Sequence, residues 1–213
     1  MNRIYAIGDI HGCATRLEAL IARLDIDARQ DLLIFVGDYI DRGPDSKKVV
    51  DMILDLMGTM NHVICLLGNH EQMFLNYCLF DREQELFLSN GGQRTLASYG
   101  FERSRRNSSF RIPNLHLRFY QSLLPCYETD DYIFVHAGLR PGIPLPEQTL
   151  DDLIWSRFEF IRSAFDFGKR VVFGHTPFSV PLVAPNKIGI DTGAVYGGML
   201  TCLELPGMIF HQA

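Results

Sequence analysis

The sequence predicts an α/β fold in which two β-sheets pack as a sandwich and helices cover the outer faces. In the first third of the chain, short apolar runs end in polar turns that contain glycine, and a helical pattern follows each turn. This βαβαβα order favours a mainly parallel sheet with buried strands. The pattern changes after residue 127, yet no linker or shift in composition divides the 213 residues. We therefore expect a single domain that spans residues 1–213.

The first sheet begins with three apolar runs. After the first run, Leu17, Leu20 and Leu24 recur at spacings of three and four, which is the period of one helix face. After the second run, Asp45 or Ser46 is expected to cap the next helix. The three predicted strands are residues 4–7, 32–36 and 63–67.

The rest of the chain divides into a helical middle and a second group of strands. Residues 81–125 predict helices and loops, with a break at Asn90-Gly91-Gly92 before a helical segment over residues 93–99. The predicted strands that follow are residues 132–135, 171–173 and 188–190, and a hairpin of residues 199–205 and 208–210.

The composition is that of an ordinary globular protein. Hydrophobic residues make up 47% and charged residues 21%, which excludes a disordered chain. The net charge of -5 argues against a dedicated nucleic-acid-binding protein. The five cysteines are scattered and form no CxxC pair, which favours a reducing compartment over a disulfide framework. Because we find no signal peptide and no apolar run long enough for a bilayer, we expect a cytoplasmic protein without a membrane partner.

Side chains that can bind metals follow the carboxyl ends of the predicted strands. In parallel α/β sheets these ends meet in one crevice, where ligands bind. Two carboxylates, three imidazoles and one amide oxygen suit divalent manganese, iron or zinc, whereas calcium prefers oxygen ligands. Six ligands exceed the need of one catalytic ion, so two ions that share a carboxylate fit better. The candidate ligands are Asp9, His11, Asp38, Asn69, His136 and His175.

Each of these residues alone has an ordinary structural explanation. An aspartate in a Gly-Asp turn, such as Asp9, most often caps a helix. The prediction depends on the whole set, because four of the seven histidines fall in glycine-flanked turns at predicted strand ends.

The turns that hold these residues form five short motifs. They are GDIHG at residues 8–12, GDYIDRG at 37–43, GNHE at 68–71, HAG at 136–138 and GH at 174–175, with supporting blocks at 90–92, 154–157 and 190–195. Together they resemble the motif set of the phosphoprotein phosphatase family of calcineurin-like metallophosphoesterases. The closer likeness is to small bacterial serine/threonine phosphatases and to the bacteriophage lambda phosphatase. It extends from residue 4 to about residue 205.

The resemblance implies a metallophosphoesterase-like fold and two divalent metal ions. Manganese is the expected metal, with iron or zinc as alternatives. One ion would be bound by Asp9, His11 and Asp38. The other would be bound by Asp38, Asn69, His136 and His175, so that Asp38 bridges the two ions.

The resemblance also implies catalytic roles. His70 would be the general acid, oriented by Asp41, and Arg42 and Arg157 would bind the phosphate oxygens. The implied reaction is hydrolysis of phosphoserine or phosphothreonine, with phosphotyrosine as a further substrate, by in-line attack of a hydroxide that bridges the metals. Physical chemistry supports these roles, because the anionic ester needs cations around it and the poor alkoxide leaving group needs a proton.

Three residues near the motifs have two interpretations each. Arg157 binds phosphate or is a surface arginine, which is the commoner situation. Tyr196 contacts substrate or serves in packing. Cys13 is more simply a buried, inert thiol than an oxidation-sensitive one.

Leu67 departs from the family pattern, which usually has arginine directly before GNHE. Leucine at this position resembles the symmetrical diadenosine tetraphosphatases, a sister branch, whereas Asp41 and Glu71 resemble the protein phosphatases. The alternative function is therefore a pyrophosphohydrolase that acts on dinucleoside polyphosphates or capped RNA ends. A remote alternative is a metal-binding regulatory module without turnover.

A basic segment lies in the middle of the chain. Its arginines are Arg103, Arg105, Arg106, Arg111 and Arg118, and no acidic residue lies between the first and the last of them. Such a run is most often a solvated surface, and the sharper hypothesis is a basic flap that recruits an acidic substrate. We expect a phosphorylated protein or a small phosphorylated molecule as the partner, with no stable nucleic-acid complex. The oligomeric state is left open.

Overall fold

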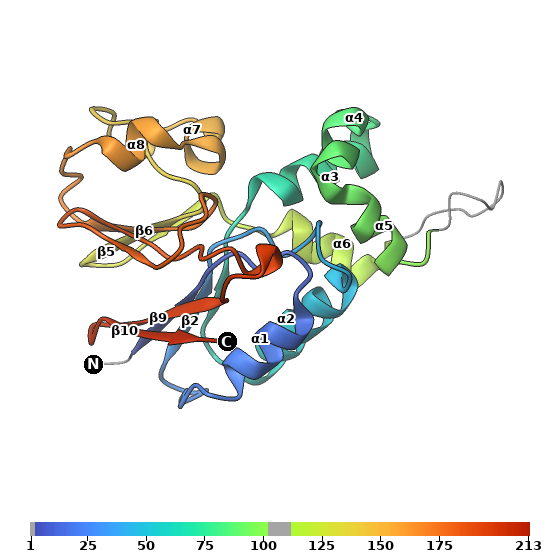
Figure 1. Ribbon diagram of the computed structural model, residues 1–213, viewed down its shortest axis with the longest axis horizontal. Coiled ribbons are helices and arrows are strands. Elements are labelled where there is room, and N and C mark those ends of the chain that lie inside the picture. Colours follow the sequence, from blue (N-terminus) through green and yellow to red (C-terminus); the bar gives the residue numbers. More distant parts are fainter. Residues whose placement is uncertain (1–2, 102–111) are drawn as a thin grey trace.

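The computed structural model describes residues 3–101 and 112–213, and it confirms the predicted architecture. Two mixed sheets of five strands face each other, and helices lie outside both sheets (Figure 1). Of the basic segment, Arg118 is exposed in the last turn of α6 (Asn114–Gln121). Its other four arginines lie outside the described residues.

The first sheet has the strand order β10-β9-β1-β2-β3. Its parallel strands are β1 (Ile4–Ile7), β2 (Leu32–Phe35) and β3 (Val63–Cys65). The predicted hairpin is present as β9 (Thr201–Leu205) and β10 (Ile209–Gln212), and β9 pairs antiparallel with β1. β3 is shorter than the predicted run over residues 63–67: Leu66 still donates its N–H to Phe35 of β2, and it also forms an isolated bridge with Leu124.

The second sheet has the strand order β4-β5-β6-β8-β7. Its parallel centre consists of β5 (Tyr132–Val135), β6 (Arg170–Phe173) and β8 (Lys187–Gly189), close to the predicted ranges. The antiparallel edge strands are β4 (Cys126–Glu128) and β7 (Leu182–Val183). The sequence does not predict these edges, because three and two residues are too few to show a period.

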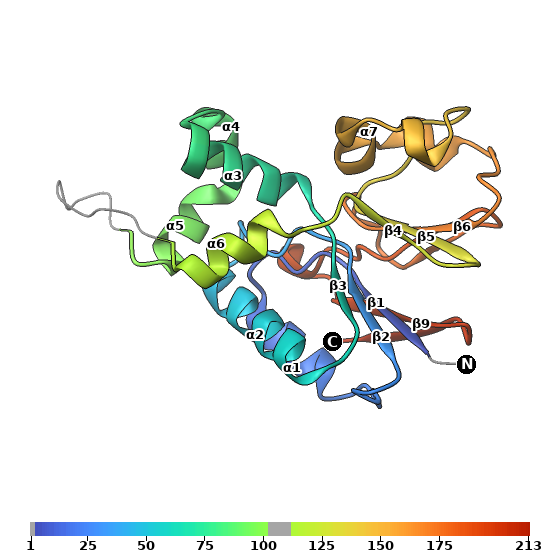
Figure 2. The same cartoon turned by 180° about the vertical axis from the view of Figure 1, so that it is seen from behind.

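Alternation along the strands builds four layers. In β1, Tyr5 packs toward α1 (Ala14–Ile21) and α2 (Ser46–Thr59), whereas Ala6 packs against the second sheet. In β5, Phe134 packs against the first sheet, whereas Ile133 packs toward α7 (Leu150–Trp155) and α8 (Phe158–Arg162). The view from behind shows each helical layer on the outer face of its own sheet (Figure 2). Both faces of each sheet are therefore buried, which explains the apolar strand sequences.

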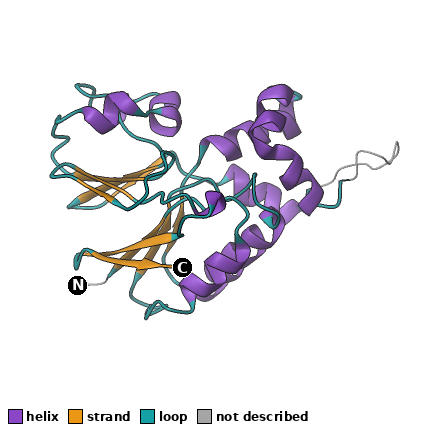
Figure 3. Cartoon of the chain, in the orientation of Figure 1, coloured by secondary structure: helices purple, strands orange, loops and turns teal. Residues whose placement is uncertain are grey.

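A helical lobe lies beside the sandwich (Figure 3). It contains α3 (Asn69–Phe80), α4 (Gln84–Phe87), α5 (Gln93–Ser98) and α6. A π-helical turn, Leu88–Gly92, joins α4 to α5, and Gly91 inside it has a φ of 100°. The predicted break at residues 90–92 is thus confirmed as a change of helix geometry rather than a loop. Shorter 3₁₀ turns cover Leu145–Glu147 and Ala194–Tyr196.

The start of α2 differs from the prediction. Asp45 occupies the N-cap position but makes no side-chain capping hydrogen bond, and Ser46 is the first helical residue. The Ser46 hydroxyl instead accepts the backbone N–H of Asp41. None of the helices within the described residues has both the length and the apolar character needed to cross a membrane.

Candidate active site

The structure brings all six predicted ligand residues together where β1, β2, β3, β5 and β6 end. Each side chain is buried, and none of the six residues is more than 5% exposed. Asp9 and His11 follow β1, Asp38 follows β2, Asn69 begins α3 directly after β3, His136 follows β5, and His175 follows β6.

Asp38 lies at the centre of the ligand cluster. Its Oδ1 is 3.3 Å from His136 Nε2, and its Oδ2 is 3.4 Å from His11 Nε2. Two groups of potential ligand atoms therefore share this carboxylate: His11, Asp38 and His70 form one group, and Asp38, His136 and His175 form the other. This sharing agrees with a bridging position for Asp38.

Asp9 lies beside these two groups of ligand atoms and belongs to neither of them. The first group of potential ligand atoms contains His70, the predicted acid, and does not contain Asp9. Both carboxylate oxygens of Asp9 accept the backbone N–H of His175, at 3.1 and 2.9 Å. Asp9 therefore links the turn after β1 to the turn after β6.

Backbone carbonyls fix the tautomers of two imidazoles. Nδ1 of His11 lies 2.8 Å from the carbonyl oxygen of Ile40, and Nδ1 of His136 lies 2.9 Å from that of Val36. Because a carbonyl can only accept, each Nδ1 donates and each Nε2 keeps its lone pair. Burial lowers the pKa of His11 to about 3 and lowers the pKa of His136 as well, so both rings are neutral at pH 7.

These tautomers bring hydrogen-bond acceptors against one another. His136 Nε2 lies 3.1 Å from Asn69 Oδ1 and 3.3 Å from Asp38 Oδ1, and none of the three atoms carries a proton. Asn69 Oδ1 also lies 3.0 Å from Nδ1 of His175, whose Nε2 is buried with no partner among the described residues. A cation would relieve such a set of facing lone pairs, so the mixed nitrogen and oxygen donors fit divalent metal ions.

The backbone around the cluster is strained. Among the described residues, eight non-glycine residues have positive φ, and five of these are predicted site residues. They are His11 (45°), Asp38 (53°), Asp41 (70°), Arg42 (65°) and His175 (64°). Such conformations persist only where the surroundings hold them, and they are concentrated at functional sites.

Two glycines allow the turns to approach the carboxylates. A Cβ at Gly68 would lie 2.2 Å from Asp38 Oδ1, and one at Gly174 would lie 2.1 Å from Asp9 Oδ1. Both distances are too short for any side chain. The glycines of the GNHE and GH motifs are therefore required by the positions of the two carboxylates.

His70 and Asp41 form the predicted pair. His70 Nδ1 is 2.6 Å from Asp41 Oδ2, and both side chains are almost completely buried. The Nε2 of His70 lies 3.9 Å from Asp38 Oδ2 and therefore faces the ligand cluster. Burial raises the pKa of Asp41, while its hydrogen bond from His70 opposes that rise. The carboxylate thus aims the free edge of the imidazole at the cluster.

Glu71 holds the turn after β2, and the motif analysis assigned it no such role. Its carboxylate accepts the backbone N–H groups of Asp38 at 2.9 Å, Tyr39 at 2.8 Å, Ile40 at 3.3 Å and Gly68 at 3.1 Å. Glu71 is the third residue of α3, and its carboxylate caps the helix by accepting the backbone N–H of the N-cap residue Gly68. An acidic residue at this helical position was the signal in the sequence.

The two predicted phosphate-binding arginines interact with different residues of the cluster. Arg42 donates from its guanidinium to His11 Nε2, and it stacks 5.5 Å from the ring centroid of Tyr196, which is 64% exposed. Arg157 is exposed, and its charge contributes to lowering the pKa of His175, which burial brings to about 2. Trp155 meets the ring of His175 edge-on at 6.0 Å. The segment that contains Trp155 and Arg157 therefore borders the cluster.

Two further residues have plain surroundings. Leu67, the residue directly before GNHE, is buried, and as a leucine it supplies no cationic side chain there. Cys13 is partly buried, and burial raises the pKa of its thiol, as expected for an unreactive cysteine.

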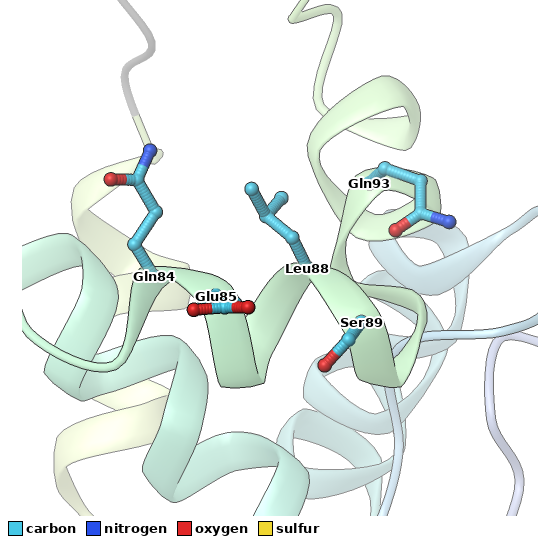
Figure 4. Close-up of a pocket in the computed structure, with 5 residues that line it drawn as sticks. All are labelled: Gln84, Glu85, Leu88, Ser89 and Gln93. Atoms are coloured by element: carbon cyan, nitrogen blue, oxygen red, sulfur yellow. The ribbon is translucent and has the colours of Figure 1, made fainter.

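A cavity of about 630 Å³ lies on the helical lobe and shares no residue with the ligand cluster. Its lining residues are Gln84, Glu85, Leu88, Ser89 and Gln93, from α4, the π-helical turn and α5 (Figure 4). None of them is a predicted site residue. Gly91 in the same turn accepts the backbone N–H of Arg42 at 3.4 Å, so the lobe touches the site at this point.

Comparison with known proteins identifies the family. The sequence model of the calcineurin-like phosphoesterase family matches residues 2–198. The chain belongs to this family. Calcineurin-like phosphoesterases of this type use a binuclear metal centre, and the two ligand groups that share Asp38 are the candidates for it.

Relatives of this calcineurin-like phosphoesterase differ in their substrates. It is 31% identical to serine/threonine-protein phosphatase 1 of Salmonella typhimurium, over 96% of this chain and 92% of the relative. It is 28% identical to the asymmetrical bis(5'-nucleosyl)-tetraphosphatase PrpE of Anoxybacillus flavithermus, over 95% and 90%. A solved structure provisionally described as a diadenosine tetraphosphatase has the same fold, with a TM-score of 0.76 and 24% identity over 100% of this chain and 93% of that one. The predicted resemblance is therefore confirmed for the family and the fold.

Proposed function

We propose that this phosphoesterase is a phosphoprotein phosphatase that hydrolyses phosphoserine and phosphothreonine monoesters, with phosphotyrosine as a further substrate. The observation that carries the proposal is the buried His70–Asp41 pair, whose Nε2 faces the ligand cluster. A serine alkoxide is a poor leaving group and needs a proton from such an acid. The 31% identity to a serine/threonine-protein phosphatase supports the same substrate class.

We assign two divalent ions to the cluster, with manganese as the expected metal and iron or zinc as alternatives. Asp9, His11 and Asp38 would hold one ion, and Asp38, Asn69, His136 and His175 would hold the other. When bound, the two ions neutralise the phosphate charge and make hydroxide available near neutral pH.

The remaining steps belong to side chains of this chain. Arg42 and Arg157 bind the non-bridging phosphate oxygens through planar guanidinium groups. His70 gives its Nε2 proton to the leaving oxygen, and Asp41 keeps Nδ1 protonated and the ring oriented. Since the transition state of phosphoryl transfer is loose, this positioning and charge stabilisation account for most of the catalysis.

Pyrophosphate hydrolysis is the second candidate. Leu67 in place of the usual arginine and the 28% identity to a bis(5'-nucleosyl)-tetraphosphatase favour a dinucleoside polyphosphate or a capped RNA end as substrate. A nucleotide leaves as a phosphate anion and depends less on a general acid than an alkoxide does. The His70–Asp41 pair therefore favours the monoesterase over this candidate and over a regulatory module without turnover.

We further propose that the partner is a phosphorylated protein or a small phosphorylated molecule in the cytoplasm, without a stable nucleic-acid or membrane complex. The net charge of -5 and the five scattered free cysteines support this setting.

The deciding experiment compares kcat/KM for a phosphoserine peptide and for diadenosine tetraphosphate, both with Mn²⁺. A tenfold preference, which equals about 1.4 kcal/mol of transition-state stabilisation, assigns the substrate class. A preference for the dinucleotide would refute the proposed function and establish the second candidate.

The proposed acid is tested by His70→Asn, with His62→Asn on the exposed surface as the matched control. We expect His70→Asn to keep its metal and to lose about 10²–10⁴-fold in kcat on the phosphopeptide. Hydrolysis of the phosphopeptide at the parental rate would show that His70 is not the acid.

A further inference from the structure

A buried pair of hydroxyls lies against Asp41. Thr95 Oγ1 donates to Asp41 Oδ1 at 2.5 Å, and the backbone N–H of Asp41 donates to Thr95 Oγ1 at 2.9 Å and to Ser46 Oγ at 3.1 Å. Ser46 Oγ lies 3.1 Å from Thr95 Oγ1. Thr95, Ser46 and Asp41 all have no exposed surface, so no water competes for these bonds.

The proton inventory gives this network one direction. A hydroxyl has a single proton, and the proton of Thr95 is used on Asp41 Oδ1. The contact between the two hydroxyls must then use the proton of Ser46. The donors therefore run from Ser46 to Thr95 to Asp41, and each bond polarises the next.

The two oxygens of Asp41 thus have different partners. Oδ1 accepts from Thr95, and Oδ2 lies 2.6 Å from His70 Nδ1. The last torsion of an aspartate is broad and poorly fixed by its own rotamers. A donor on each oxygen fixes this torsion, and the plane of the carboxylate then sets the direction of the imidazole.

Thr95 belongs to α5, and the helical lobe meets the site at a second point nearby. Gly91 accepts the backbone N–H of Arg42 at 3.4 Å, and a Cβ at Gly91 would lie 2.8 Å from that nitrogen. Residues 91 and 95 therefore both contact the 41–42 turn, where Asp41 and Arg42 have positive φ.

We propose that Thr95 is a positioning residue for the general acid: its hydroxyl holds Asp41 in the orientation that aligns His70 with the leaving oxygen. The proposal rests on the proposed role of His70. Without the Thr95 hydroxyl, Oδ1 of a fully buried carboxylate loses its donor, and the carboxylate turns away from the geometry that His70 needs.

The test uses Thr95→Val, which keeps the shape and removes the hydroxyl, and Thr95→Ser, which keeps the hydroxyl and removes the methyl group. The readout is kcat with Mn²⁺ on phenyl phosphate, which needs an acid, and on 2,4-dinitrophenyl phosphate, which does not. We expect Thr95→Val to lose about 10–100-fold on phenyl phosphate, the size of loss that is typical when a hydrogen-bond partner of a metal ligand is removed. The loss on the dinitrophenyl ester should be small, because that leaving group needs no acid. Thr95→Ser should recover most of the loss.

Ser98→Ala is the matched control, because Ser98 is on the same helix and its hydroxyl bonds to Lys47 N–H and Thr95 O, away from Asp41. It should behave as the parent on both esters. Metal content and the thermal midpoint are measured for every variant. Thr95→Ala provides a second hydroxyl deletion if the valine variant does not fold, and the same split between the two esters is expected.

Equal losses on both esters, or no loss on phenyl phosphate, would overturn the role of Thr95. Measuring His70→Asn in parallel separates this result from the proposed function. If His70→Asn shows the split between esters and Thr95→Val does not, the acid stands and the positioning role falls. If His70→Asn loses activity equally on both esters, the acid assignment falls and the role of Thr95 falls with it.

Discussion

Glu71→Gln is expected to destabilise the protein strongly, although the change removes only a charge and preserves the shape. The carboxylate accepts four backbone N–H groups, two on each oxygen: Tyr39 and Ile40 on Oε1, and Asp38 and Gly68 on Oε2. A glutamine amide offers one oxygen and one NH₂ group. Whichever way the amide turns, two backbone N–H groups lose their acceptor and face another donor.

The cost follows from those two donors. A buried N–H group without an acceptor costs about 1–3 kcal/mol, so the substitution should cost roughly 2–6 kcal/mol. Because natural domains are stable by about 5–15 kcal/mol, this is a large share of the total. The Asp38 and Gly68 amides belong to the turns that carry the proposed metal ligands, so metal affinity should fall as well.

The assay is guanidinium unfolding of the parent and the variant in chelator, which removes any contribution from bound metal. Glu85→Gln is the control, because Glu85 is exposed on the same lobe and should change stability by less than about 0.5 kcal/mol. A loss below about 1 kcal/mol for Glu71→Gln would refute the reasoning. It would mean that Glu71 is already protonated and neutral, which is the direction in which burial shifts its pKa. The four backbone amides would then not depend on a charged carboxylate.

Three further predictions concern metal, pH and the basic segment. Asp9→Asn and His175→Asn should each lose bound metal and activity together, which metal analysis of the purified variants measures. Burial lowers the pKa of His11 from 6.5 to about 3, so the unfolded chain takes up a proton that the folded chain refuses. The unfolding free energy of the metal-free protein should therefore decrease as the pH is lowered from about 6.5 to about 3, and the decrease should be less steep in His11→Gln. Replacing Arg105 and Arg106 by alanine should raise KM for an anionic substrate and flatten its salt dependence, and an unchanged KM would exclude a recruiting role.

Local patterns predicted most of the fold because strands and turns are coded by neighbouring residues. The strands β1, β2 and β5 are apolar runs that end at glycine-containing turns, and they occur where expected. The end of β3 could not be predicted, because Leu66 stays buried and still donates its N–H to Phe35 of β2, while it also forms a bridge with the distant Leu124. The composition of a strand reports burial and does not report which neighbour it pairs with.

The same distinction applies to the site. The clustering of the candidate ligands could be predicted because each lies in a short motif at a strand end, and strand ends converge in this fold. Thr95 could not be predicted, because its contact with Asp41 spans 54 residues and a buried threonine in a helix has no sequence signature. The part played by Asp9 is also a tertiary fact, since its hydrogen bond to the His175 amide joins residues 166 apart.

Hydrogen bonds within the protein hold the turns that carry the proposed metal ligands, so a metal ion is not needed to shape these turns. Left-handed backbone at five site residues costs on the order of 1–3 kcal/mol at each position. Glu71 offsets this cost at Asp38, Thr95 and Ser46 offset it at Asp41, and Asp9 offsets it at His175. The chain therefore sets the ligand positions, and an entering ion gains the interaction with lone pairs that already face one another. His175→Asn should then remove metal and leave the turns in place, whereas substitutions of Glu71 or Asp9 should loosen the turns themselves.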